Sequence, residues 1–62
     1  MNYRELHEII MALSETELRQ MLEEERRGDR RRTFMIRLHQ RLCALRAQRE
    51  REEIERVCAT NA

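Results

Sequence analysis

The chain has 62 residues, of which 40% are hydrophobic and 40% are charged, and it contains one Gly, no Pro and no Trp. A chain of this length buries only about 60% of the surface that its unfolded form exposes, so a lone monomer has a small core. Its two cysteines are too few for a disulfide scaffold, which leaves oligomerisation or a partner as the route to stability. The shortage of Gly and Pro, together with many Glu, Arg and Leu residues, predicts an all-α fold.

The charged residues nearly balance one another. All 13 cations are Arg, and 12 acidic residues oppose them, for a formal net charge of +1. This balance gives no reason to expect bulk attraction to DNA or to an anionic membrane. The amino-terminal residues lack the apolar segment of an export signal, and no apolar run approaches the ~20 residues that span a bilayer. We therefore expect a cytoplasmic protein with reduced thiols and no membrane association.

A first short helix is predicted at the amino terminus. Asn2 followed by Glu5 forms a capping-box pattern, which is typical of a helix start. The apolar residues that follow recur at spacings of three and four, as one face of a helix requires. They are Tyr3, Leu6, Ile10 and Leu13.

A second short helix is predicted from Ser14. Ser14 and Glu17 repeat the capping-box pattern, and Leu13 and Leu18 occupy the two positions of a hydrophobic staple. The helix is expected to end at Gly28, because Gly is common just after the carboxyl end of a helix.

The third predicted helix is the longest. Asp29 is expected to cap it, and no helix-breaking residue follows before Thr60. We expect a single helical domain over residues 1–58 and a frayed end over residues 59–62. One apolar stripe on this helix has heptad-like spacing and is assigned to the core or to self-association: Phe34, Met35, Leu38, Leu42 and Leu45.

A second, weaker apolar stripe lies more than 100° around the same helix. It consists of Ile36, Cys43, Ala47 and Ile54, with Cys58 beyond them. A helix with two apolar stripes needs two contacts. We therefore predict a helical hairpin in which the two short helices fold against one stripe, while a second copy or another partner covers the other stripe in a dimeric bundle.

Catalytic and metal chemistry find little support in the sequence. His39 and Cys43 are four residues apart, a spacing at which two side chains on a helix can share a metal ion, but no CxxC or HxxxH pattern accompanies them. As a nucleophile and base they lack an orienting third group and an oxyanion site. Interface packing is the preferred interpretation, and we expect no enzyme activity, no cofactor and no metal.

An arginine stripe offers the clearest candidate binding site. On the predicted third helix, Arg30, Arg37 and Arg41 fall within about 40° of one another, as in helices that run along phosphates. Alternatively, these arginines pair with the acidic tract of residues 23–25 and with carboxylates of a partner. We favour the second interpretation, because Arg is enriched in the binding hot spots of protein interfaces and no recognised nucleic-acid motif is present.

The sequence therefore predicts a small non-enzymatic regulator, inhibitor or adaptor that acts by stoichiometric binding to a protein partner. Chains of this kind are frequently encoded by phages or other mobile elements. The alternative is an RNA- or DNA-binding helical-hairpin dimer that uses the arginine stripe. In architecture alone, the chain is similar to small helical-hairpin regulators of phages and plasmids, some of which bind RNA.

Overall fold

The computed structural model describes residues 1–60, and it confirms the all-α prediction. Three α-helices follow one another: α1 (Tyr3–Ile9), α2 (Glu15–Arg27) and α3 (Arg32–Thr60). A 3₁₀ turn, η1 (Ile10–Ala12), continues α1, and the described residues contain no strand. None of the helices in this part of the chain is both long enough and apolar enough to cross a lipid bilayer.

The helix starts that the sequence predicted at Asn2 and Ser14 are both present. The Asn2 side chain accepts a hydrogen bond from the backbone N–H of Glu5 at 2.8 Å. Ser14 and Glu17 form a complete capping box, in which each side chain accepts a hydrogen bond from the backbone N–H of the other at 3.2 Å. These caps satisfy N–H groups that have no partner within the helix.

The third helix starts later than predicted. Asp29 does not cap it, because α3 begins at Arg32 and its first backbone hydrogen bond runs from Met35 N–H to the carbonyl of Arg31. The intervening residues form the turn that reverses the chain. Within this turn Arg30, and not Gly28, adopts a positive φ of 52°. Arg30 therefore lies outside α3, which corrects its predicted place on the helix.

Gly28 caps the carboxyl end of α2. Its backbone N–H donates a hydrogen bond to the Glu24 carbonyl at 2.9 Å, and a Cβ atom at this position would lie only 3.2 Å from the same carbonyl oxygen. The last turn of α2 therefore leaves little room for a side chain at this position, which suits the smallest residue.

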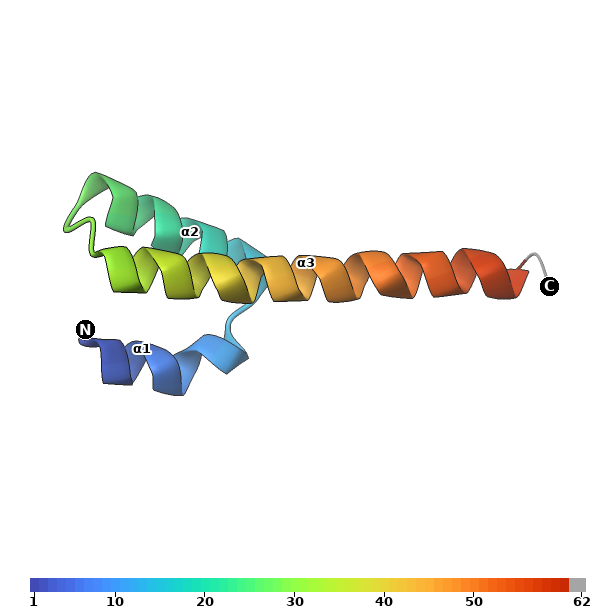
Figure 1. The fold of residues 1–62 in the computed structure, drawn as a ribbon, viewed down its shortest axis with the longest axis horizontal. Helices are drawn as coiled ribbons and strands as arrows, with labels where there is room; N and C mark the ends of the chain where they lie inside the picture. The colour runs from blue at the N-terminus through green and yellow to red at the C-terminus, as the bar shows by residue number, and fades with distance from the viewer. Residues whose placement is uncertain (61–62) are drawn as a thin grey trace.

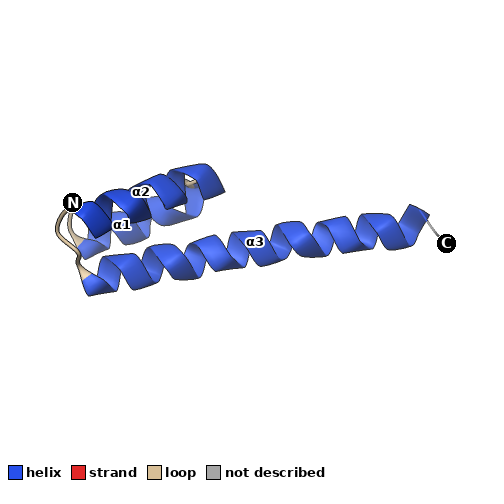
Figure 2. Cartoon of the chain, turned by 90° about the horizontal axis from the view of Figure 1, so that it is seen from above, coloured by secondary structure: helices blue, strands red, loops and turns tan. Residues whose placement is uncertain are grey.

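Two views show how the helices are arranged. Figure 1 shows α2 beside the first half of α3, to which the turn connects it, and α1 on the other side of the same half. Figure 2 shows the second half of α3 extending beyond both short helices. The molecule measures 49 × 22 × 15 Å, so α3 sets its longest dimension.

The core lies where α1, η1 and α2 meet the first half of α3. Its buried side chains are Leu6, Ile10, Leu18, Phe34 and Leu38. Partly buried side chains pack around them: Leu13, Met21, Leu22, Leu42 and Leu45. Full burial of a Leu or Phe side chain contributes about 1.5–3 kcal/mol, so five such residues give a modest core.

The carboxyl end of α3 overlaps the predicted frayed segment. Residues 59–60 are helical in the structure, and residues 61–62 of that prediction lie outside the described residues.

Candidate protein-interaction surfaces

The structure separates the two predicted apolar stripes of α3. Within the first stripe, Phe34 and Leu38 are buried, Leu42 and Leu45 pack against the core, and Met35 is half-buried. All members of the second stripe are exposed: Ile36, Cys43, Ala47, Ile54 and Cys58. The first stripe therefore faces α1 and α2, whereas the second stripe faces solvent.

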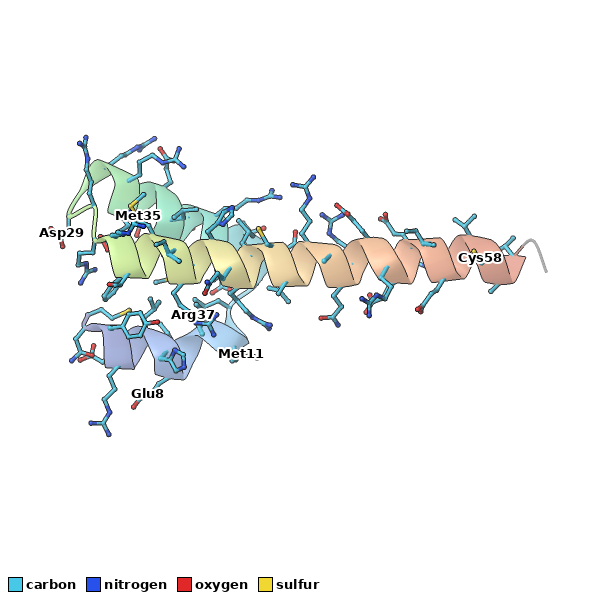
Figure 3. All side chains as sticks on the ribbon, in the orientation of Figure 1. Glu8, Met11, Asp29, Met35, Arg37 and Cys58 are labelled. Carbon is cyan, nitrogen blue, oxygen red and sulfur yellow. The ribbon has the colours of Figure 1, made fainter. Side chains whose placement is uncertain are left out.

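The predicted arginine stripe is not a continuous cationic face. Arg30 lies in the turn, where its Nε donates a hydrogen bond to the Arg26 carbonyl. Arg37 and Arg41 are on α3 but are half-buried, and their Nε atoms are buried without a hydrogen-bond partner among the described residues. Figure 3 shows Arg37 on the side of α3 that faces α1. Both side chains thus direct part of their guanidinium group inward.

Arg31 joins the three helices at the turn. Its Nε and Nη2 lie 2.8 and 2.7 Å from the Glu25 carboxylate at the end of α2. Its Nη1 donates a hydrogen bond to the Met1 carbonyl at 2.6 Å, and its guanidinium carbon lies 3.5 Å from the centre of the Phe34 ring. Glu25 is only 7% exposed, so this member of the acidic tract of residues 23–25 is buried, and it pairs with Arg31 and not with the predicted Arg30, Arg37 or Arg41.

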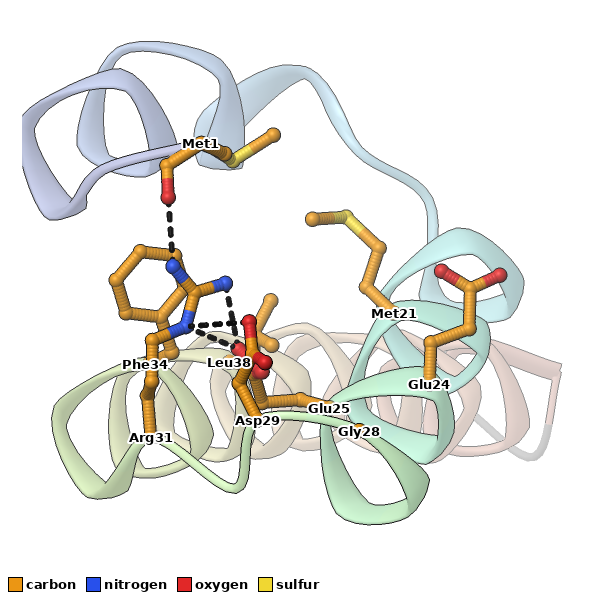
Figure 4. A pocket seen from close by; sticks show the side chains of 9 residues that line it. All are labelled: Met1, Met21, Glu24, Glu25, Gly28, Asp29, Arg31, Phe34 and Leu38. Atoms are coloured by element: carbon orange, nitrogen blue, oxygen red, sulfur yellow. Dashed lines mark hydrogen bonds and ion pairs between the residues drawn. The ribbon is translucent and has the colours of Figure 1, made fainter.

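An open pocket adjoins this contact. It has a volume of about 270 Å³ and lies between α1 and α2, with Phe34 and Leu38 of α3 at its base. Figure 4 shows Met1 and Met21 facing one another across the pocket, and the Arg31 guanidinium bound to Glu25 and to the Met1 carbonyl. Because Arg31 pairs with Glu25 and binds the Met1 carbonyl, these contacts hold the helices together, and we assign them to the fold and not to ligand binding.

The second half of α3 carries an exposed apolar patch. Ile54 and Val57 are 62% and 59% exposed, and together with Glu53 and Cys58 they line a shallow depression. We call these four residues the distal patch. Every described residue of α3 after Leu45 is exposed.

A second apolar depression lies beside α2, and we call it the proximal hollow. Met35, Ile36 and His39 of α3 line it together with Leu22 and Arg26 of α2. Ile36 is 42% exposed. Figure 3 shows Met35 on the α2 side of α3 and Cys58 near the opposite end of the helix.

His39 and Cys43 are close together but have no further ligand-type neighbour. The Cys43 Sγ lies 3.5 Å from His39 Nε2. Among residues 1–60, no three His, Cys, Asp or Glu side chains gather as a metal site requires.

Ion pairs hold part of the second half of α3. Arg46 Nε donates a hydrogen bond to Glu50 at 2.9 Å along the helix. Arg49 binds Glu15 at the start of α2 at 3.2 Å, and this carboxylate raises the pKa of Arg49. The Glu15 contact connects α3 to the start of α2, just after the link from η1.

Three of these features were missed by the reasoning from sequence. The Arg31–Glu25 and Arg49–Glu15 pairs join residues 6 and 34 positions apart, so neither appears in a helical repeat. Val57 was not predicted, because the second stripe continues from Ile54 to Cys58, four residues later, whereas Val57 follows Ile54 by three. A seam traced with alternating steps of four and three residues finds Val57.

Comparisons with known proteins add no relative. No protein family, curated protein or solved structure matches the chain.

Proposed function

We propose that this chain is a non-enzymatic regulator, inhibitor or adaptor that acts by stoichiometric binding to a protein partner. The observation that carries this proposal is the solvent-facing side of α3, which we call the outer face. It consists of Ile36, Cys43, Ala47, Ile54 and Val57, with Gln40 and Glu50 between them, and all seven are exposed.

The composition of the outer face fits a protein partner. Apolar side chains with charged residues on either side are typical of a helix that packs against another helix. The half of α3 beyond Leu45 has only the Arg49–Glu15 ion pair with the rest of the described chain. Covering its apolar residues would add buried area to a molecule that has little.

The proposal includes the finer features expected from the sequence. In it, α2 and α3 act as a helical hairpin, and two such chains form a bundle. The free thiols of Cys43 and Cys58 fit a reducing compartment such as the cytoplasm. Encoding by a phage or another mobile element belongs to the same proposal.

Nucleic-acid binding is the second candidate. We rank it below protein binding because of where the three arginines of the predicted stripe lie. Phosphate binding along a helix needs exposed cations at regular spacing. Arg30 is off the helix, and Arg37 and Arg41 are half-buried. These three residues remain the candidates for phosphate contact if RNA or DNA is the partner.

The test is recovery of the tagged protein from host lysate after nuclease treatment. A stoichiometric protein should be captured, and Ile54→Glu should abolish its capture because it places a charge on the outer face. Met11→Glu is the matched control, since Met11 and Ile54 are both 62% exposed and Met11 lies on η1, away from this face.

Direct binding to nucleic acid is measured in parallel. We expect no affinity tighter than ~10 μM for duplex or hairpin RNA or DNA at physiological salt, which is the non-specific range. Two results together would contradict the proposal and favour nucleic-acid binding. The first is submicromolar binding in which log affinity falls against log salt concentration with a slope of about −0.9 per phosphate contact. The second is a slope that is smaller in magnitude by about one in Arg37→Ala.

A further inference from the structure

We infer that the outer face of α3 binds a second copy of this chain, with the two α3 helices antiparallel and the two-fold axis close to Ala47. This inference rests on the proposed function in one respect, namely that the outer face binds protein. It adds, to the bundle of two chains in that proposal, the face at which they meet and the orientation in which they bind.

The spacing of the outer face is that of a coiled-coil seam. From Ile36 to Val57 its members follow one another in steps of four and three residues without interruption. The seam spans three heptads, or about 30 Å at 1.5 Å per residue. Its central members are Cys43, Ala47 and Glu50. Cys43 and Ala47 are small, so two helices can approach closely there, and Glu50 is bound to Arg46 of its own helix.

The charges along α3 favour an antiparallel pair. Residues 32–46 carry no acidic residue, and of their four arginines Arg32 and Arg46 are exposed while Arg37 and Arg41 are half-buried. Residues 47–60 carry four glutamates and three arginines. A parallel pair would set the two arginine-rich halves side by side, where like charges repel. An antiparallel pair sets each arginine-rich half against the glutamate-containing half of its partner.

The two apolar depressions also match in an antiparallel pair. Met35, Ile36 and His39 of the proximal hollow are each followed, 18 residues later, by Glu53, Ile54 and Val57 of the distal patch. Because 18 residues make five helical turns of 3.6 residues, both depressions lie on one side of α3, about 27 Å apart.

Rotation about an axis near Ala47 brings the distal patch of one copy over the proximal hollow of the other. Ile36 then lies opposite the partner's Val57, and His39 lies near the partner's Glu53. Arg26 of α2 adds a cation at the edge of the same hollow. The contact occurs twice, as an isologous interface requires. A parallel pair would instead join the two distal patches to each other.

Disulfide trapping tests the orientation. In the antiparallel pair, Cys43 lies opposite position 50 of the partner. One variant, Cys58→Ser, keeps only Cys43. A second variant carries Cys43→Ser, Cys58→Ser and Glu50→Cys. Mild oxidation of the mixture should join the two variants at least tenfold faster than it joins either variant to itself, and 6 M urea should remove this preference.

Rapid self-linkage of the Cys58→Ser variant through Cys43 would show a parallel pair and would overturn the inference. So would equal rates for all combinations in the folded protein.

Light scattering coupled to size exclusion tests the assembly. At tens of micromolar, the natural chain should have twice the 7.7 kDa mass of one chain, and so should Met11→Glu. Ile54→Glu should have the mass of one chain, with an unchanged circular dichroism spectrum to show that it folds.

The two proposals fail in different ways. A natural chain that is monomeric but still captures a protein from lysate in an Ile54-dependent manner overturns the second-copy inference and the bundle of two chains, and keeps the proposed binding to a protein partner. A monomer that captures nothing overturns both.

Discussion

Arg31 combines several stabilising contacts in one side chain. It pairs with Glu25, hydrogen-bonds to the Met1 carbonyl and stacks on the Phe34 ring, so it connects the ends of all three helices. Stacking of a guanidinium on an aromatic ring contributes about 0.5–2 kcal/mol, depending on how far the pair is desolvated. Residues 1–60 contain five buried apolar side chains, so a contact of this size is a substantial part of the free energy of unfolding.

Arg31→Ala should therefore lower the free energy of unfolding by about 2 kcal/mol. This value is below the usual cost of 3–5 kcal/mol for breaking a buried pair, because the Arg31 side chain is 37% exposed while Glu25 is 7% exposed. Urea unfolding followed by circular dichroism measures the change. The control is Arg32→Ala, which removes an exposed arginine one residue away and should cost less than about 0.5 kcal/mol. Equal losses in the two variants would show that the Glu25 pair is not important.

Arg30 adopts a backbone conformation that suits Gly better than Arg. A positive φ costs a residue with a Cβ atom about 1–2 kcal/mol, and Gly avoids this cost. Gly also gives the unfolded chain more conformational freedom, which offsets part of the gain in stability. Arg30→Gly should thus stabilise the protein by about 0.5–1 kcal/mol and raise Tm by a few degrees. Differential scanning calorimetry would show this, and a lowered Tm would mean that the Arg30 side chain contributes more than its backbone costs.

At the residue level, the sequence predicted what is local and missed what depends on the turn. Asn2 and Ser14 cap their helices because each cap involves only the next three residues. The function of Arg31 depends on a turn that starts α3 two residues later than an Asp29 cap would, and that also brings Met1 within reach. No pattern along the chain contains this information.

The α3 helix consists of two parts with different surroundings. Its first half contributes Phe34 and Leu38 to the core, whereas every described residue of its second half is exposed and Arg49 connects that half to α2. Periodicity predicted both apolar stripes but did not show which of them packs inside the chain. Which stripe is buried depends on where α1 and α2 lie, and in the structure both short helices cover the first stripe.

Leucine truncations in the first half should differ according to burial. Leu38 is 1% exposed, so Leu38→Ala should cost about 3 kcal/mol or more. Leu42 is only partly buried, so Leu42→Ala should cost about half as much. Thermal unfolding of both variants beside Met11→Ala, an exposed control, gives the comparison. A larger effect at Leu42 than at Leu38 would contradict the core described above.

Backbone amides in the two halves of α3 should exchange with solvent at different rates. Amides near Leu38 should be protected to the level of global unfolding, whereas amides of residues 50–60 should open locally, because only exposed pairs at i, i+4 support them. Hydrogen exchange at low micromolar concentration measures this difference. Uniform protection along α3 in a monomeric sample would show that its second half has a stability of its own.

At the scale of the whole molecule, stability should depend on concentration. If two copies share the outer face, Tm should rise as the protein concentration increases from 1 to 100 μM, and Ile54→Glu should remove this dependence. Scanning fluorimetry with an added dye, or circular dichroism, records both curves. A natural chain with a Tm independent of concentration would contradict a dimer in this range.

The length of α3 also has a consequence for valence. Arg32, the first residue of α3 after the arginine-rich turn, lies 15 residues from Ala47, so an antiparallel pair would hold its two turns about 45 Å apart on stiff helices. A target that repeats its binding site at this interval would engage both chains of the pair at once, because the first contact would raise the effective concentration for the second. A target with one site would gain nothing from the pairing. The length of α3 would thus set the spacing of the two chains, and it would favour targets with repeated sites, such as filaments and symmetric assemblies, over targets with one site.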